Sequence, residues 1–395
     1  MLHKIELPAY KDQLECVLDF QQHLLAFACD SNTPVSPDPQ AVIAEFGKDI
    51  GDWLCKRLWG SQQKQQKFYK QLVTVIAYVK QCPLESQKIV EAFEGDRDYY
   101  HQLDNSAFEF KYGNLDAEAR KVLAPLMVSF YEKLLYVGFP PFIHQGQDRL
   151  LNRAILLQEF RRANPRLQVC PGCDGPRTRS DDDEGDEDEE DEANEDDERE
   201  EEDDDEGKDL SDIDHFFPKK AYPFFSIHPF NLVPLCTDCN VKVKRQKDPV
   251  DVHGPDELSR TFLPFVKPAV SLIEVSVSRK RNGKPVVYIR DKEQTGSRRV
   301  DNLDRVFKLR RYWKKRLLRM FDLMQYQLSE VRAHEKLTGE GSGEKIVRQK
   351  LYEYLGDYEN NVGFIEHLLI HGSYARYAID NPKEFEALLA QLLRS

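Results

Sequence analysis

The sequence predicts an α+β protein in which mainly helical N- and C-terminal regions flank a small cysteine-rich core. Three observations lead to this prediction. Apolar residues recur at helical spacing through most of residues 1–165 and 301–395. Two Cys-x-x-Cys pairs lie between these regions, in a core that we place at 166–250. Two runs that alternate like strands follow within 251–300. At 395 residues, the chain has room for two or three domains.

The N-terminal region is expected to be a helical scaffold. Three runs of apolar residues have helical spacing, and a fourth run resumes at Leu150–Ala163 after a pair of prolines. Asp116 is a suitable N-cap for the third run. His101 and His144 stand alone, so the sequence of this region offers no catalytic constellation. The three runs are Val42, Phe46, Ile50, Trp53 and Leu54, then Phe68, Leu72, Ile76 and Val79, then Leu123, Met127, Phe130, Leu134 and Val137.

The eight cysteines fall into two classes. Four are scattered singly through helical sequence, and four form the pairs Cys170/Cys173 and Cys236/Cys239. In a chain of this length with no recognisable signal peptide, such pairs indicate metal binding before disulfides. Four thiolates match a closed tetrahedral zinc site with Zn–S distances of about 2.3 Å, which would hold the fold and do no chemistry. The alternative is that the pairs never meet and one is redox-active, but no thioredoxin-like βαβ pattern surrounds either pair.

The chain is basic outside one strongly acidic tract. The net charge is −13, but Asp181–Glu206 alone contains 22 Asp or Glu and one Arg, so the remainder of the chain carries +8. A basic body of this kind attracts polyanions such as nucleic acid. The tract has almost no apolar residue to bury, so we expect a disordered insertion over 180–208. It is either a solvated loop or a mimic of the phosphate backbone that shields a basic site. Without its 26 residues, the 62 residues between the cysteine pairs shrink to 36, enough for a short two-stranded element.

A hairpin and a basic helix are expected after the cysteines. The strand-like runs are Val270–Val277 and Val286–Asp291, and an Asn-Gly dipeptide between them is a strong hairpin signal. A long amphipathic helix follows from Val306 to Val331. Its polar faces are rich in basic residues, which either form a solvated surface or bind phosphates without reading sequence. The candidate nucleic-acid contacts on this helix are Arg310, Arg311, Lys314 and Lys315. Further helices are expected around Val347–Leu355, Phe364–Ile370 and Phe385–Leu393.

One dense segment carries the candidate chemistry. It reads Asp-Ile-Asp-His-Phe-Phe-Pro-Lys over 212–219 and Ile-His-Pro-Phe-Asn-Leu-Val-Pro-Leu-Cys-Thr-Asp-Cys-Asn over 227–240. The order Asp-His, Asn-Leu and Cys-x-x-Cys-Asn resembles the zinc-stapled branch of the HNH nuclease family. The run is similar to HNH proteins of bacterial anti-phage defence, such as the nucleases of Septu-like and retron-associated systems. The resemblance covers about 75 residues, 170–244. It implies the ββα-metal core of that family, which is two strands and a helix around one divalent ion.

The resemblance assigns roles to individual residues. His215 matches the general base, and a neutral imidazole with a pKa near 6.5 suits proton abstraction from water. Asp214 and Asn240 match the ligands of a catalytic Mg²⁺ or Mn²⁺, which prefers oxygen ligands and retains several waters. Asn231 matches the middle asparagine, whose hydrogen bonds hold the loop that bears the base. His228 lies in the same motif before a proline and is either structural or substrate-facing.

This chain departs from the family pattern in two places. The last position is Asn240 rather than histidine, which is a weaker ligand for soft metals. Val243 stands where a lysine is usual. We therefore assign the phosphate contact to Lys242 or Lys244, with Arg245 beside them.

These features predict a metal-dependent endonuclease that hydrolyses DNA. The resemblance implies a setting in bacterial defence, beside an ATPase partner that senses infection. Three alternatives stay open: a zinc-bound DNA-binding module that does not cut, an RNA-directed nuclease, and an interaction subunit that cleaves only within a complex. No apolar stretch approaches the roughly 20 residues needed to span a bilayer, so we expect a cytoplasmic protein with no membrane partner. The oligomeric state and the sequence preference stay open.

Overall fold

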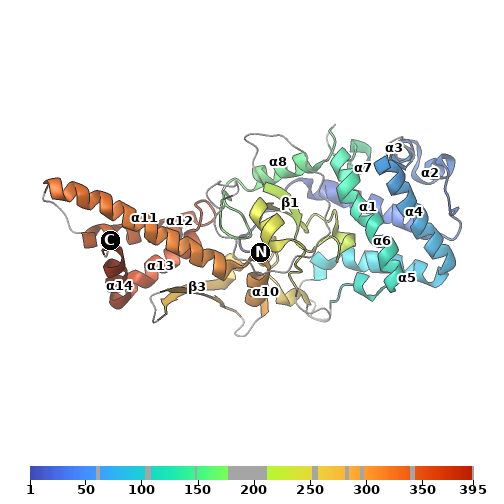
Figure 1. Cartoon of the computed structure of the whole chain (residues 1–395). Helices are drawn as coiled ribbons and strands as arrows, with labels where there is room; N and C mark the ends of the chain where they lie inside the picture. Colours follow the sequence, from blue (N-terminus) through green and yellow to red (C-terminus); the bar gives the residue numbers. More distant parts are fainter. Residues whose placement is uncertain are drawn as a thin grey trace.

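The computed structural model describes residues 1–58, 63–102, 108–146, 149–176, 211–250, 257–280, 284–293, 298–338 and 343–393. The insertion expected at 180–208 therefore lies outside the described residues. Within them the chain is mostly helical and contains two small antiparallel sheets of two strands each, which agrees with the predicted α+β class. The molecule is elongated, with the N-terminal helices at one end, the C-terminal helices at the other and the cysteine-rich core between them (Figure 1).

The N-terminal region forms the helical scaffold that its periodicity predicts. Phe20 lies near its centre, with its ring 5.9–6.0 Å from the rings of Phe46 and Phe130. Asp116 caps α6 as predicted, because its side chain accepts a hydrogen bond from the Glu118 backbone N–H. The elements are α1 (Tyr10–Cys29), α2 (Pro39–Phe46), α3 (Lys48–Leu58), α4 (Gln63–Gln81), α5 (Pro83–Arg97), η1 (Tyr99–Gln102), η2 (Tyr112–Asn114), α6 (Ala117–Ser129), the π-helix η3 (Phe130–Leu135), α7 (Pro141–His144) and α8 (Arg153–Ala163).

The core contains a short antiparallel hairpin followed by a helical turn. Strand β1 (Ser211–His215) pairs with β2 (Leu232–Cys236), so that Ser211 lies opposite Cys236 and His215 lies opposite Leu232. Every residue of β2 is buried, as expected for a strand covered on both faces. The loop between the strands contains η5 (Pro223–Phe225), and the π-helix η6 (Asp238–Lys244) follows β2 directly. The hairpin therefore has a cysteine end and a histidine end.

The hairpin predicted within 251–300 lies between the core and the C-terminal helices, after two short helices. Strands β3 and β4 pair from Ile273 opposite Asp291 to Arg279 opposite Pro285, and the Asn-Gly turn lies outside the described residues. Arg279 joins this hairpin to the last helix, because its side chain is paired with Glu384 at 2.5 Å. The remaining elements are η7 (Glu257–Arg260), α9 (Ala269–Leu272), β3 (Ile273–Arg279), β4 (Pro285–Asp291), α10 (Arg298–Phe307), α11 (Leu309–Thr338), α12 (Gly343–Asn361), α13 (Leu368–Asp380) and α14 (Pro382–Leu392).

Two predicted helices are broken in the structure. The first N-terminal run divides into α2 and α3 at Gly47, whose φ of 74° is left-handed. The long basic helix divides into α10 and α11 at Lys308, where φ is 51°. Apolar spacing continues across both breaks, since both sides bury side chains in the core, so periodicity alone does not reveal them. Phe364, expected within a helix, is 53% exposed before α13 begins at Leu368. None of the described helices is long and apolar enough to cross a membrane.

Candidate functional site

The four paired cysteines meet at one end of the β1–β2 hairpin. All are buried, and their sulfur atoms lie within 4.8 Å of one another. Tetrahedral zinc with Zn–S bonds of about 2.3 Å would place its sulfurs about 3.8 Å apart, close to the observed spacing. Backbone N–H groups of Cys236 and Cys239 donate to Cys170 Sγ and Cys236 Sγ, each at 3.4 Å. Such donors stabilise thiolates, so the cluster is well suited to bind a metal ion.

The first cysteine turn is built tightly against the C-terminal helices. A Cβ on Gly172 would lie 2.7 Å from the Phe307 ring, and a Cβ on Gly175 would lie 2.2 Å from the Tyr312 hydroxyl. Trp313 is fully buried, and its indole N–H donates to the Cys173 carbonyl at 3.2 Å. A larger residue at Gly172 would push the turn away from α10, and one at Gly175 would push it away from α11. The cysteine turn is therefore also the point where the core is attached to the C-terminal region.

Asp174 extends this attachment to both ends of the chain. Its carboxylate is fully buried, with Oδ1 2.7 Å from His3 Nε2. Its Oδ2 accepts from the backbone N–H of Leu369 at 3.1 Å, and its carbonyl accepts from that of His367 at 2.7 Å. The first residues also reach the turn directly, since the His3 N–H donates to the Pro171 carbonyl at 3.0 Å. One short turn thus ties the N-terminal residues, the cysteines and α13 together.

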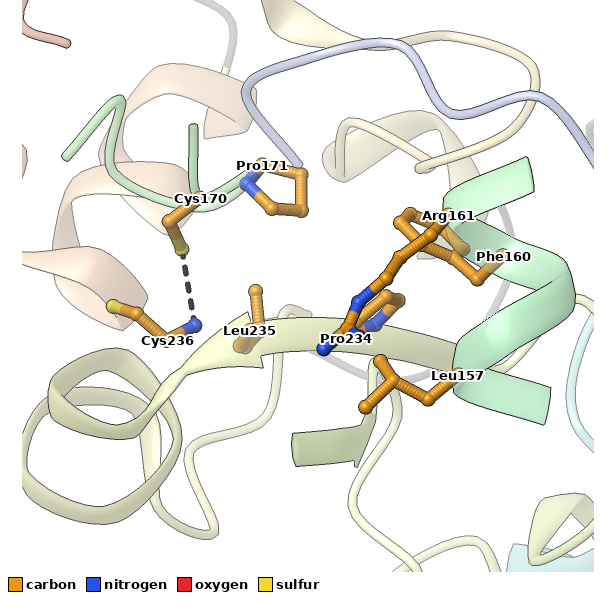
Figure 2. A pocket seen from close by; sticks show the side chains of 8 residues that line it. All are labelled: Leu157, Phe160, Arg161, Cys170, Pro171, Pro234, Leu235 and Cys236. Carbon is orange, nitrogen blue, oxygen red and sulfur yellow. Dashed lines mark hydrogen bonds between the residues drawn. The ribbon is translucent and has the colours of Figure 1, made fainter. Parts of the chain in front are cut away.

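A small cleft lies beside the cysteines. It runs between the first cysteine turn, β2 and α8, and Figure 2 shows Cys170 Sγ facing the backbone nitrogen of Cys236 across its edge. The cleft is narrow and mostly apolar, and none of the predicted site residues except cysteines borders it. Its lining residues are Leu157, Phe160, Arg161, Cys170, Pro171, Pro234, Leu235 and Cys236.

The histidine end of the hairpin presents Asp214 and His215. His215 is 4% exposed, and its Nε2–H donates to the Ser226 carbonyl at 2.8 Å. A carbonyl can only accept, so the neutral ring keeps its lone pair on Nδ1. Burial, together with the nearby cations Lys219 and Lys244, lowers the pKa of His215 to about 3. The imidazole is therefore neutral and fixed in direction at neutral pH.

Asn231 supports the loop that follows His215. It is fully buried, and its Oδ1 accepts from the Phe217 N–H at 2.7 Å. Its Nδ2 donates to the carbonyls of Phe217 and Phe225 at 3.1 and 3.0 Å. Asn231 therefore joins the two ends of the loop segment from Phe217 to Phe225 through its side-chain amide.

Lys244 is not placed as a phosphate contact. The sequence offers Lys242 or Lys244 as the phosphate contact, but Lys244 is 1% exposed and its Nζ lies 2.8 Å from Asp214 Oδ2. The same ammonium donates to the His215 carbonyl at 2.6 Å. The π-helical turn of η6, which is wider than an α-helical turn, directs this residue back under β1. Any divalent cation at Asp214 must therefore share the carboxylate with this ammonium or displace it.

The other predicted site residues in η6 and directly after it differ in their exposure. Asn240 lies four residues before Lys244 in η6, and it is partly buried. Lys242 and Arg245 are exposed, and Lys242 forms an ion pair with Asp238 at 3.2 Å. Both remain available to a polyanion at the surface.

The basic face of α11 is only partly as predicted. Arg310 is held back by acidic residues of α10, with 3.0 Å between its Nη1 and Asp304 Oδ2. The side chains of Arg311, Lys314 and Lys315 are exposed. The helix starts at the cysteine end of the hairpin and leads away from β1 (Figure 1). These cations therefore form a surface separate from His215.

Sequence reasoning left His228 undecided and passed over the N-terminal residues around His215. His228 is structural: it is 2% exposed, its Nε2 donates to the Arg97 carbonyl at 2.9 Å, and the Phe230 N–H donates to its Nδ1 at 3.3 Å. Tyr131 packs edge-on against His215 with 4.3 Å between ring centroids. No spacing in the sequence connects Tyr131 with residues more than 80 positions later, because only tertiary packing brings them together.

Comparison with known proteins adds little to this geometry. No protein-family model matches the sequence, and neither does any solved structure. "Protein ea31" of Escherichia phage lambda is 44% identical to this chain over 55 residues. The aligned part is 14% of this chain and 17% of the phage protein, so the chain spans about a sixth of the length of the relative it matches. A match of that extent does not show a family.

Proposed function

We propose that this chain is a metal-dependent endonuclease that hydrolyses phosphodiester bonds of DNA. The observation that carries the proposal is the state of His215. Its imidazole is neutral, its Nε2–H is fixed on the Ser226 carbonyl, and a carboxylate precedes it in the chain. A general base needs this combination of protonation state and direction. A phosphate anion bound beside the ring would raise its low pKa towards neutrality, where a base works best.

The residues divide the reaction in the following way. Nδ1 of His215 takes a proton from the attacking water, while the Ser226 carbonyl and the Tyr131 ring keep the imidazole from rotating. Asp214 and Asn240 would hold a Mg²⁺ or Mn²⁺ ion, which when bound supplies positive charge to the leaving oxygen. The four cysteines would hold zinc, which would fix the hairpin to η6, the element that carries Asn240.

A plasmid nicking assay tests the proposal. Supercoiled DNA is incubated with the full chain and Mg²⁺ or Mn²⁺, and wild type is compared with His215→Ala. Loss of the base should slow nicking by roughly 10²- to 10⁴-fold. His101→Ala removes an exposed histidine from the N-terminal region and serves as the matched control. Divalent-dependent nicking that survives in His215→Ala would remove this residue as the base. Offering DNA and RNA in one reaction decides between the two polymers.

A second candidate function is a zinc-bound DNA-binding module that does not cut. The observation that favours it is Lys244, whose ammonium sits where a cation is expected beside Asp214. This candidate predicts that wild type binds DNA and leaves it intact with every divalent ion. The family resemblance supports a setting in bacterial defence with an ATPase partner. A subunit of that kind would cut DNA only within the complex, and its partner should copurify with it.

A further inference from the structure

Tyr131 contacts several residues at the histidine end of the hairpin, although it lies in the N-terminal region. Its side chain is 3% exposed, and its hydroxyl donates to the Ile213 carbonyl of β1 at 2.6 Å. The ring also packs edge-on against His215. Because both contacts fix the same ring against the same strand, anything that rests on Tyr131 is held at a defined place relative to His215.

Two cations rest on this ring, and they come from different elements. Arg153 is the first residue of α8, and its guanidinium carbon lies 4.0 Å from the Tyr131 centroid. Lys219 belongs to the loop after β1, and its Nζ lies 5.3 Å from the same centroid. Both act on the His215 imidazole through their charge. Cations stacked on an aromatic ring give up little freedom when they bind an anion, since the ring already orders them.

The charges at this place do not cancel. Lys219 is 30% exposed and is paired with Glu132 at 2.9 Å. Arg153 is partly buried, and within the part of the chain that the structure describes no carboxylate lies within ion-pair distance of it. Among the described residues, the Arg153 side chain makes one hydrogen bond, a long one of 3.4 Å to the Tyr131 carbonyl. A net positive charge therefore remains beside a neutral histidine, which suits an anionic ligand.

We propose that Arg153 and Lys219, ordered on the Tyr131 ring, bind the phosphates of the DNA strand that passes His215. This site rests on the proposed function and names the substrate contacts that the motif does not contain. It replaces Lys244, which is buried under β1, as the phosphate contact of the site. It also differs from the exposed cations of α11, which lead away from β1 (Figure 1). Arginine suits the position because its planar fork matches phosphate oxygens.

The test is a binding measurement that needs no cleavage. Fluorescence anisotropy of a short labelled DNA duplex is followed with the full chain over a salt series, with no divalent ion added. Arg153→Gln and Lys219→Gln should each weaken binding roughly tenfold, and the slope of log affinity against log salt should become shallower by about one. Arg153→Lys keeps the charge but loses the planar fork, so it should retain more affinity than Arg153→Gln but less than wild type. Arg162→Gln, an exposed cation on the same helix, is the matched control.

Glu132→Gln gives a result in the opposite direction. It removes the carboxylate that competes for Lys219, so DNA binding should tighten by several-fold. A purely structural role for these side chains would not produce tighter binding. This variant also keeps the proposal testable if Arg153→Gln does not fold, which a thermal unfolding curve of each protein reveals.

The outcomes separate this site from the nuclease. Unchanged affinity and salt slope in Arg153→Gln and Lys219→Gln would overturn the site, and so would a loss of binding confined to Lys314→Gln and Lys315→Gln. Absence of DNA binding by wild type would also overturn it. Weaker binding in both variants, together with no nicking by wild type, would support the site and contradict only the proposed cleavage.

Discussion

The two ends of the β1–β2 hairpin are built on different principles. At one end, four cysteines of two sequence motifs close around each other, and all four have the same chemistry. At the other end, His215 is surrounded by groups from separate elements: Ser226 from a loop, Lys244 from η6 and Tyr131 from the N-terminal region. The first end depends on spacing along the chain, whereas the second depends on how distant segments pack. The comparison suggests that the cysteine end holds the fold and that the histidine end can be altered without destroying it.

The largest effect is expected at the cysteine end. Replacing Cys173 or Cys236 by Ser should abolish zinc binding and unfold the core locally, because a structural zinc contributes binding energy of roughly 10 kcal/mol or more to folding. Metal analysis and thermal unfolding of the purified proteins measure both effects. Cys16→Ser, which changes a partly exposed cysteine in α1, is the control and should retain the metal. A full zinc content in either variant would contradict the four-cysteine site.

A smaller but still large effect is expected at the histidine end. Lys244→Met removes the counter-charge from a buried carboxylate, which should cost about 3–5 kcal/mol of unfolding free energy. Millimolar Mg²⁺ should restore part of this loss, because a cation bound at Asp214 replaces the ammonium charge. Thermal unfolding with and without Mg²⁺ measures the change.

Lys242→Met is the matched control for this experiment. Lys242 lies on the same helix but is exposed, so its loss should change the unfolding free energy by less than about 1 kcal/mol. Destabilisation of Lys244→Met that Mg²⁺ does not relieve would count against an ion site at Asp214. A Lys244→Met protein as stable as wild type would show that the pair does not hold this end of the hairpin.

The same contrast explains what could be predicted from sequence. The cysteine cluster and the β3–β4 hairpin follow from local rules, because Cys-x-x-Cys turns and an Asn-Gly dipeptide each encode a geometry within a few residues. The hydrogen bonds of Asn231 to the loop after His215 are of the kind that the family resemblance implies. The helical class of the two flanking regions follows from periodicity alone.

What could not be predicted depends on tertiary packing. Lys244 and Lys242 are two positions apart and chemically identical, yet one is buried under β1 and the other is exposed. Only the π-helical turn of η6 and its position against the strand decide between them. Tyr131 and Arg153 belong to a region whose sequence indicates a scaffold, and they reach His215 because α8 and η3 pack on the core. The spacing of a motif carries no information about such neighbours.

The smallest predicted effect concerns pH and belongs to the histidine end. Burial lowers the pKa of His228 from 6.5 to about 4, and in the folded protein its Nδ1 already accepts the Phe230 N–H. The unfolded chain therefore binds a proton between these pH values that the folded chain does not. Stability should be full above pH 6.5 and should fall as the pH drops towards 4. At about one unit below 6.5, the expected loss is about 1.4 kcal/mol for this residue.

His228→Gln isolates this contribution. Glutamine can still donate and accept hydrogen bonds but does not titrate. On acidification to one unit below 6.5, the variant should therefore lose about 1.4 kcal/mol less unfolding free energy than wild type. His101 is an exposed histidine nearby whose charge is the smallest contribution to the low pKa of His228, so His101→Gln should change the pH dependence only slightly. Identical acid profiles for wild type and His228→Gln would mean that this imidazole is not buried in its neutral form. The loop between β1 and β2 would then be held less rigidly than the cysteine end, and the fixed direction of His215 would need another cause.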